Sequence, residues 1–375
     1  MASSPSPSSL DSTSPNATQA RLPTLSPEFI AQHYPKEASL LHVILLNRHG
    51  ERAPAKHRFT SISPKDWNFC EHSGQLEADF LKAAGYFIPA PATNKYAGGK
   101  LKQDAWGGMM FRKNASATQP AKDTSALDTQ KATCVPSQLT DIGRKKLTAL
   151  GAHMRALYVD ALGFLPATPR PGITGGPTDD IRLRTTAFNR AFASLQHILG
   201  GLYPSLPANT PLFRVYARSP RIENMYPNPV CKSLSQLFER ANELSYDNFA
   251  SEHASLRQDM LKIPALRAHF DKEDNHNIMH FATAAWDTLI SMHSHGLPLP
   301  KEIDDAFIAR VSQVAAIEHL NAAVKPLALT RVEIGNFAHE LIGNIVHAVE
   351  TDRGALSGKQ PSPKMGVYSG HDTTI

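Results

Sequence analysis

The stretch Leu40-Leu-His-Val-Ile-Leu-Leu46, followed at once by Asn47-Arg-His-Gly-Glu-Arg-Ala-Pro54, sets the fold class expected for this chain. A short aliphatic run with a β-branched centre is typical of a buried strand in a parallel sheet. In open α/β sheets, ligands gather beyond the carboxyl ends of the strands. The charged residues directly after this strand therefore indicate a binding site.

The sequence on either side of this stretch alternates between helical and strand patterns. Thr140 can cap a helix, a second helix follows Arg184, a third covers 329–349, and a further strand covers 365–370. Residues 55–137 show little periodicity and are interpreted as long loops with an insertion over 111–133, whereas 220–325 are interpreted as mostly helical. The pattern predicts an α/β fold with a three-layer core, a mostly parallel sheet flanked by helices, and a mainly helical cap insertion.

These elements give a domain division. We expect a disordered Ser/Pro-rich tail over 1–35 and one domain over 36–375. The core of that domain would comprise about 36–70, 138–218 and 326–375, and the cap and insertions about 71–137 and 219–325.

Composition limits the classes of function. Of the 375 residues, 41% are hydrophobic, which is enough for a sizeable core, and no run approaches the roughly 18 to 20 apolar residues needed to cross a bilayer. The formal net charge of +5 comes from scattered Lys and Arg rather than from blocks. We therefore expect a small anionic substrate, no nucleic-acid partner and no integral membrane segment.

Cysteine usage and the N-terminal composition bear on location. Cys70, Cys134 and Cys231 are few and far apart, which favours reduced thiols over a disulfide framework. No apolar segment of the secretory type follows the start of the chain. A cytoplasmic location is expected, with a mitochondrial one as the alternative.

The chemistry of two segments is complementary. Arg48 and Arg52 present planar donor forks that match phosphate oxygens, and the His49 imidazole between them can attack phosphorus. His371 and Asp372 follow the second strand, where the histidine can donate to a phosphate and a protonated carboxyl can give its proton to a departing alcohol oxygen. Together these residues indicate transfer of a phosphoryl group.

Arg48-His-Gly-Glu-Arg-Ala-Pro54 fits the signature R-H-G-x-R-x-P, and the chain resembles the histidine acid phosphatase family, the second branch of the histidine phosphatase superfamily, with a phosphoglycerate mutase-like fold. Three further stretches are similar to motifs of that family: Gln138-Leu-Thr-Asp-Ile-Gly143, Arg184-Thr-Thr-Ala-Phe-Asn-Arg190 and His371-Asp-Thr-Thr374. Within the family, Asp66-Trp-Asn68, Met225-Tyr-Pro-Asn228 and His295-Gly-Leu-Pro298 are most similar to lysophosphatidic acid phosphatase-like members.

The resemblance implies an acid phosphatase that hydrolyses phosphomonoesters through a covalent phosphohistidine. It implies His49 as nucleophile and Asp372 as proton donor, with phosphate bound by Arg48, Arg52, Arg184 and His371. Motif matching favours Arg184 over its neighbours Arg182, the main rival, and Arg190. No cofactor and no metal is implied, His49 is expected to be neutral and His371 cationic, and protonation of Asp372 implies an acidic pH preference.

Three alternatives stay open. The substrate could be lysophosphatidic acid or a similar ester, or the activity could be of the phytase type on inositol phosphates. The chain stops at Ile375, three residues after Asp372, where the family continues through a helix, so a truncated and inactive phosphate-binding remnant is the third reading.

Overall fold

A computed structural model describes residues 22–71, 87–89, 133–173, 178–204, 213–270, 281–320, 326–354 and 362–375. Its centre is a five-stranded sheet in which every neighbouring pair is parallel. In spatial order the strands are β1 (Val43–Arg48), β5 (Met365–Gly370), β3 (Ile181–Thr185), β4 (Phe213–Tyr216) and β2 (Phe87–Pro89). The predicted parallel α/β sheet is confirmed.

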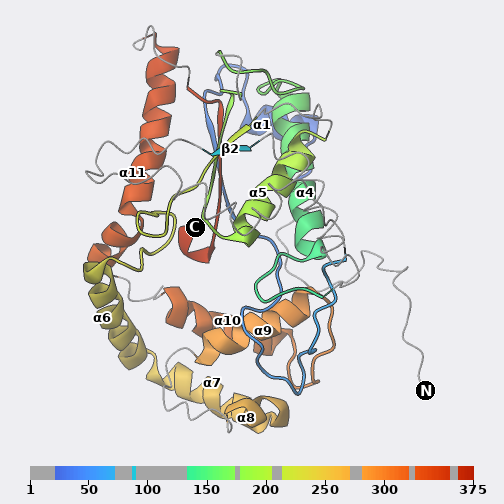
Figure 1. The fold of residues 1–375 in the computed structure, drawn as a ribbon, viewed down its shortest axis with the longest axis vertical. Coiled ribbons are helices and arrows are strands. Elements are labelled where there is room, and N and C mark those ends of the chain that lie inside the picture. Colours follow the sequence, from blue (N-terminus) through green and yellow to red (C-terminus); the bar gives the residue numbers. More distant parts are fainter. Residues whose placement is uncertain are drawn as a thin grey trace, which may run out of the picture.

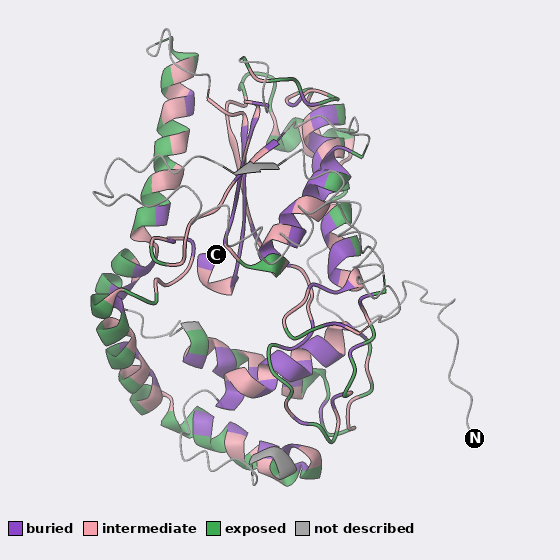
Figure 2. Cartoon of the chain, in the orientation of Figure 1, coloured by how far each residue is buried: buried purple, intermediate pink, exposed green. Residues whose placement is uncertain are grey.

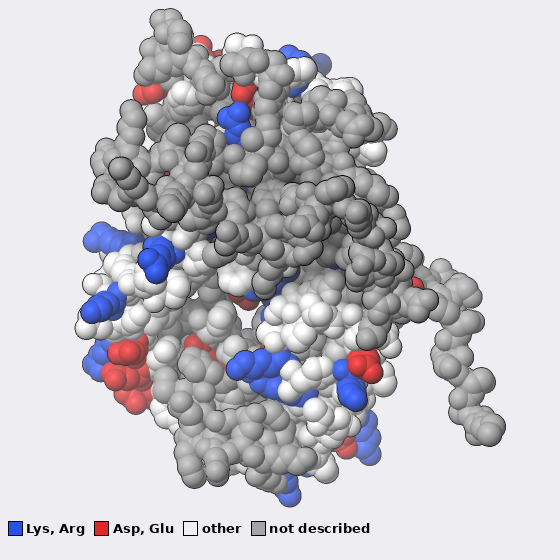
Figure 3. Space-filling model, in the orientation of Figure 1, with Lys and Arg blue, Asp and Glu red and all other residues white. Residues whose placement is uncertain are grey.

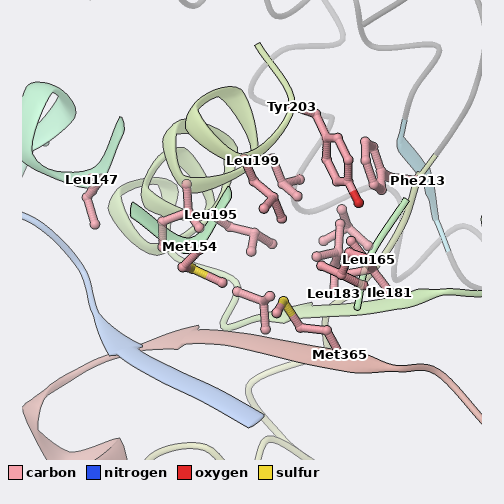
Figure 4. Close-up of a cluster of buried hydrophobic side chains, with 14 of the residues drawn as sticks. Leu147, Met154, Leu165, Ile181, Leu183, Leu195, Leu199, Tyr203, Phe213 and Met365 are labelled. Atoms are coloured by element: carbon pink, nitrogen blue, oxygen red, sulfur yellow. The ribbon is translucent and has the colours of Figure 1, made fainter. Parts of the chain in front are cut away.

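Helices cover both faces of this sheet, as Figure 1 shows. α4 (Asp141–Arg155) and α5 (Asn189–Leu202) pack on one face, and α11 (Leu327–Asp352) lies on the other. The main hydrophobic cluster fills the space between the sheet and the α4–α5 pair (Figure 4). This arrangement is the predicted three-layer core.

α4 begins where the sequence predicts, because the Thr140 hydroxyl accepts a hydrogen bond from the Gly143 amide. Its apolar residues Leu147 and Met154 are buried against α5 and the sheet. α4 and α5 approach so closely that a Cβ on Gly201 would lie 2.0 Å from the Thr148 carbonyl oxygen. A side chain at this position would force the two helices apart.

A second group of helices forms the region predicted as the helical cap. It comprises α6 (Lys232–Asn248), α7 (Ala250–Lys262), α8 (Pro264–Phe270), α9 (Phe281–Ser294) and α10 (Asp305–Leu320). α7, α8, α9 and α10 share a second hydrophobic cluster, which includes Met260 and Leu289 and to which Phe59 also belongs. Figure 2 shows buried residues along α9 and α10. Because α9 and α10 lie towards the end of the sheet where β5 stops, they can contribute side chains to that edge (Figure 1).

Two predictions about the N-terminal part of the chain need correction. Residues 1–21 of the predicted tail lie outside the described residues, but Pro27–His33 form helix α1. The Ser26 hydroxyl caps this helix by accepting from the Phe29 amide, and Pro27 stands at its first position. Residues 87–89, assigned to the cap or insertions, instead supply the edge strand β2.

The cysteines differ from the prediction of reduced thiols. Cys70 and Cys134 form a disulfide, and only Cys231 is free. The two cysteines lie 64 residues apart in sequence, but the Cys134 amide donates to the Trp67 carbonyl at 2.7 Å and so brings the segments together. The prediction of reduced thiols is therefore wrong for this pair, and the cytoplasmic location stays a prediction.

Two surface properties follow from the described residues. None of their helices combines the length and the apolar composition that crossing a bilayer requires. On the face shown in Figure 3, basic and acidic side chains are interspersed.

The contact between α4 and α5 can be tested with two adjacent glycines. Gly201→Ala is expected to lower the free energy of unfolding by about 1–3 kcal/mol, because the added methyl group meets backbone atoms of α4. Gly200 has open space around its Cβ position, so Gly200→Ala should stabilise the protein by about 0.5–1 kcal/mol through helix propensity. Chemical denaturation of both variants measures the difference, and equal effects would contradict this packing.

Candidate active site

The pairing of β1 with β5 brings the two predicted histidines together. Arg48 lies opposite Gly370 in the register, and the His49 amide donates to the Gly370 carbonyl at 3.0 Å. The rings of His49 and His371 have centroids 5.5 Å apart, and the two residues are only 4% and 6% exposed. Two segments more than 300 residues apart in sequence therefore form one site at the carboxyl edge of the sheet.

The His49 ring is held in one tautomer. Its Nδ1–H donates to the Gly50 carbonyl at 2.9 Å, so that Nε2 carries the free lone pair when the ring is neutral. Burial, followed by the positive charge of Arg48, lowers the pKa of His49 to about 2. A neutral His49 imidazole over the physiological range would leave Nε2 able to act as a nucleophile.

Three guanidinium groups surround this imidazole. Arg48 is the last residue of β1, and its guanidinium carbon lies 5.9 Å from the centre of the Trp286 ring. Arg52 donates to an Asp287 oxygen at 2.8 Å, and Arg190, in the first turn of α5, approaches His371 Nδ1 at 3.5 Å. Burial, followed by the charges of Arg52 and Arg48, lowers the pKa of Arg190 to about 10. The positive charges of the three arginines repel one another, which favours the binding of an anion among them.

The structure does not bring Arg184 to these guanidinium groups. Its guanidinium is 1% exposed and is engaged by Glu223 at 2.6 Å and by Glu340 at 2.5 Å, on the face of the sheet that carries α11. Side chains alternate along a strand, so Arg182, the main rival, shares that face and lies 3.6 Å from Glu340. Arg190 completes the cluster instead, because α5 points its N-terminus at the carboxyl edge of the sheet.

We call Arg48, His49, Arg52, Arg190, His371 and Asp372 the cationic cluster. All of the predicted site residues except Arg184 belong to it. His371 differs from the expectation of a cationic ring, because burial and then the charge of Arg190 lower its pKa to about 4. A positively charged His371 therefore requires a bound anion to offset the guanidinium groups.

Asp372 lies at the start of the 3₁₀ turn Asp372–Thr374, which directly follows the loop residue His371. One carboxylate oxygen lies 3.5 Å from Arg48 Nε, and the other lies 3.7 Å from His319 Nε2 of α10. Burial alone would raise the pKa of Asp372, but the His319 contact and the charge of Arg48 outweigh it and lower the pKa below its usual range. The carboxyl gains a proton more readily when an anion neutralises Arg48.

Helices of the cap region supply residues that the sequence did not single out. Asp287 of α9 holds Arg52 and also accepts from the Ala55 amide at 2.9 Å, and His319 of α10 reaches Asp372. Neither residue belongs to a motif that can be recognised in the sequence. Each reaches the site only because the cap helices pack near the edge of the sheet. Arg190 did carry a signal, since it closes the quoted Arg184–Arg190 stretch.

An aromatic pair borders the cluster on the His371 side. The rings of Phe188 and His371 meet edge to face with centroids 4.8 Å apart, and Tyr226 contacts both rings. Phe188 stays 39% exposed although it is a large apolar residue. An apolar group attached to a bound phosphate could pack against this pair.

Several known proteins are similar to this chain in sequence. A probable acid phosphatase of Schizosaccharomyces pombe is 26% identical over 354 residues, which cover 91% of this chain and 68% of that protein. Human lysophosphatidic acid phosphatase type 6 is 24% identical over 240 residues, covering 64% of this chain and 50% of that protein. Apart from the first, the curated relatives are matched over about half of their length.

Among solved structures, a Hafnia alvei phytase in complex with myo-inositol hexakis sulphate aligns with a TM-score of 0.49 and 15% identity, covering 90% of this chain and 73% of that one. The family model of the histidine phosphatase superfamily, branch 2, matches residues 39–375. The chain therefore belongs to branch 2 of the histidine phosphatase superfamily.

Proposed function

We propose that this chain is a metal-independent phosphomonoester hydrolase that works through a phosphohistidine at His49. The observation that carries the proposal is the neutral His49 imidazole, with Nε2 free, among Arg48, Arg52 and Arg190. A nucleophile without charge inside a cationic cluster suits attack on an anionic phosphate ester.

The reaction divides into two displacements at phosphorus. His49 Nε2 attacks and forms the N–P bond while the bond to the alcohol oxygen breaks, and Asp372 gives that oxygen its proton. Water then attacks phosphorus, the N–P bond breaks, and the Asp372 carboxylate accepts the water proton. Free phosphate leaves, and Asp372 is again protonated for the next cycle.

The guanidinium groups supply most of the electrostatic stabilisation in this scheme. Negative charge builds on the equatorial oxygens of the transferring group, and Arg48, Arg52 and Arg190 are fixed around it before reaction. Asp287 holds the Arg52 guanidinium at 2.8 Å. His371 joins them once a bound phosphate favours its protonated form.

The aromatic pair supports an ester with an apolar portion. Phe188 and Tyr226 stand beside His371, where the alcohol part of a bound ester could leave the cluster. We therefore propose a lysophospholipid such as lysophosphatidic acid ahead of a phytase-type substrate, whose several phosphates would favour cations at this border. An inactive remnant would bind phosphate through the same cluster without hydrolysing an ester. The trapping experiment described next distinguishes such a remnant from an active enzyme.

Trapping the intermediate tests the nucleophile. Rapid quenching with a radiolabelled phosphomonoester should label the wild-type protein with phosphate that is stable in alkali and labile in acid, and His49→Ala should carry none. Asp372→Asn should still be labelled by an ester with a good leaving group, but it should lose the label slowly because the base is gone. A folded wild-type protein with neither label nor turnover would support the remnant instead.

The role of Arg190 can be measured directly. Arg190→Gln is expected to lower kcat/KM by about 10²–10³-fold, since one preorganised donor to the transition state is lost. Arg240→Gln removes an exposed arginine of α6 and should leave kcat/KM unchanged. Wild-type activity in Arg190→Gln would exclude this arginine from the phosphate site.

The pH profile reports on the proton donor. Because Asp372 must be protonated, kcat/KM should fall as the pH rises. His319 lowers the pKa of Asp372, so His319→Gln should raise it and shift the descending limb to higher pH. His33→Gln, at an exposed site of α1, serves as the control. An unmoved limb in His319→Gln would contradict the assignment of the limb to Asp372.

A further inference from the structure

We propose that Arg184 is a positioning residue that holds the Asp372 carboxyl in place through a buried chain of polar contacts from Glu223 to Thr374. The inference rests on the proposed function, because it concerns the proton donor of that reaction. Arg184 contacts neither histidine of the cationic cluster. Its effect must pass through the residues that separate it from Asp372.

The first link is a buried ion pair. Arg184 donates to Glu223 Oε1 at 2.6 Å, and both side chains are almost fully excluded from solvent. The same guanidinium donates to Glu340 of α11 and to the Asn224 side chain, each at 2.5 Å. Removing Arg184 would leave the Glu223 carboxylate buried without its counter-charge, which is far more disruptive than losing an exposed pair.

The second link runs from Glu223 into the backbone. Oε1, the oxygen that Arg184 holds, also accepts from the Asn224 and Met225 amides at 2.8 and 2.9 Å. One carboxylate oxygen thus fixes three consecutive residues as a tight turn. The next residue, Tyr226, carries the ring that contacts His371.

The third link joins this turn to the proposed proton donor. The Thr374 hydroxyl donates to the Met225 carbonyl and accepts from the His371 amide at 2.9 Å. The Thr374 amide donates to the His371 carbonyl at 3.0 Å, which closes the short turn that contains Asp372. The Thr374 hydroxyl oxygen therefore joins the two turns.

The chemical consequence concerns the leaving group. A general acid acts only when its proton lies within hydrogen-bond reach of the departing oxygen, and a displacement of about 1 Å costs up to about 10²-fold in rate. Esters of acidic alcohols need little protonation, whereas alkyl esters depend on it. A displaced Asp372 would therefore slow alkyl phosphates more than aryl phosphates.

The test compares kcat/KM for glycerol 2-phosphate and 4-nitrophenyl phosphate. Arg184→Met should lower the value for glycerol 2-phosphate at least about tenfold more than that for 4-nitrophenyl phosphate. Arg182→Met is the matched control, because Arg182 lies on the same face of β3 and reaches Glu340 but is not bonded to Glu223. It should change both values by the same factor.

A second pair of variants leaves the buried charges untouched. Thr374→Val removes the hydroxyl that joins the two turns and should show the same bias against glycerol 2-phosphate, and Thr374→Ser should restore the wild-type ratio. A wild-type ratio in Thr374→Val, or an equal loss on both substrates in a folded Arg184→Met, would overturn the inference while the proposed function stands. A folded wild-type protein that is inactive on both substrates would overturn the proposed function itself, and this inference with it.

Discussion

The parallel pairing of β1 with β5 is the constraint on which the site depends. It places Arg48 opposite Gly370, so that the two chain segments leaving the sheet at this edge, His49 to Arg52 and His371 to Asp372, emerge side by side. β5 is buried along its whole length between β1 and β3, which leaves it no freedom to shift in register. A shift of one residue would turn its side chains to the opposite faces of the sheet.

Around this edge, positive charges gather with few carboxylates to neutralise them. Burial and the charges of neighbouring arginines lower the pKa of Arg48 and that of Arg190. Of the nearby acids, Asp287 binds Arg52, and Asp372 contacts both Arg48 and His319. The face of the sheet that carries α11 is organised differently, since Arg184 is held there by two carboxylates. The charge of Arg184 is therefore neutralised inside the protein, whereas the three arginines at the carboxyl edge outnumber the two carboxylates that contact them, Asp287 and Asp372.

The sequence was informative wherever the signal was local. The strand before Arg48, the helix capped by Thr140 and the strand over 365–370 all follow from periodicity and capping, and His49 follows from its neighbours. Arg184 and Arg190 could not be ranked in this way, because the choice depends on which face of β3 meets α11 and on where α5 points its first turn. Asp287, His319 and the Cys70–Cys134 disulfide were missed for a similar reason, since each depends on contacts between distant segments.

We expect the cationic cluster to bind one tetrahedral anion directly beside His49 Nε2. A crystal structure of the protein with orthovanadate, which adopts the geometry of a transferring phosphoryl group, tests it most directly. We expect vanadium to be bonded to His49 Nε2, with Arg184 still bound to Glu223. The vanadate oxygens should be in hydrogen-bond contact with Arg48, Arg52, Arg190 and His371. Vanadate held away from His49, or contacted by Arg184 in place of Arg190, would contradict it.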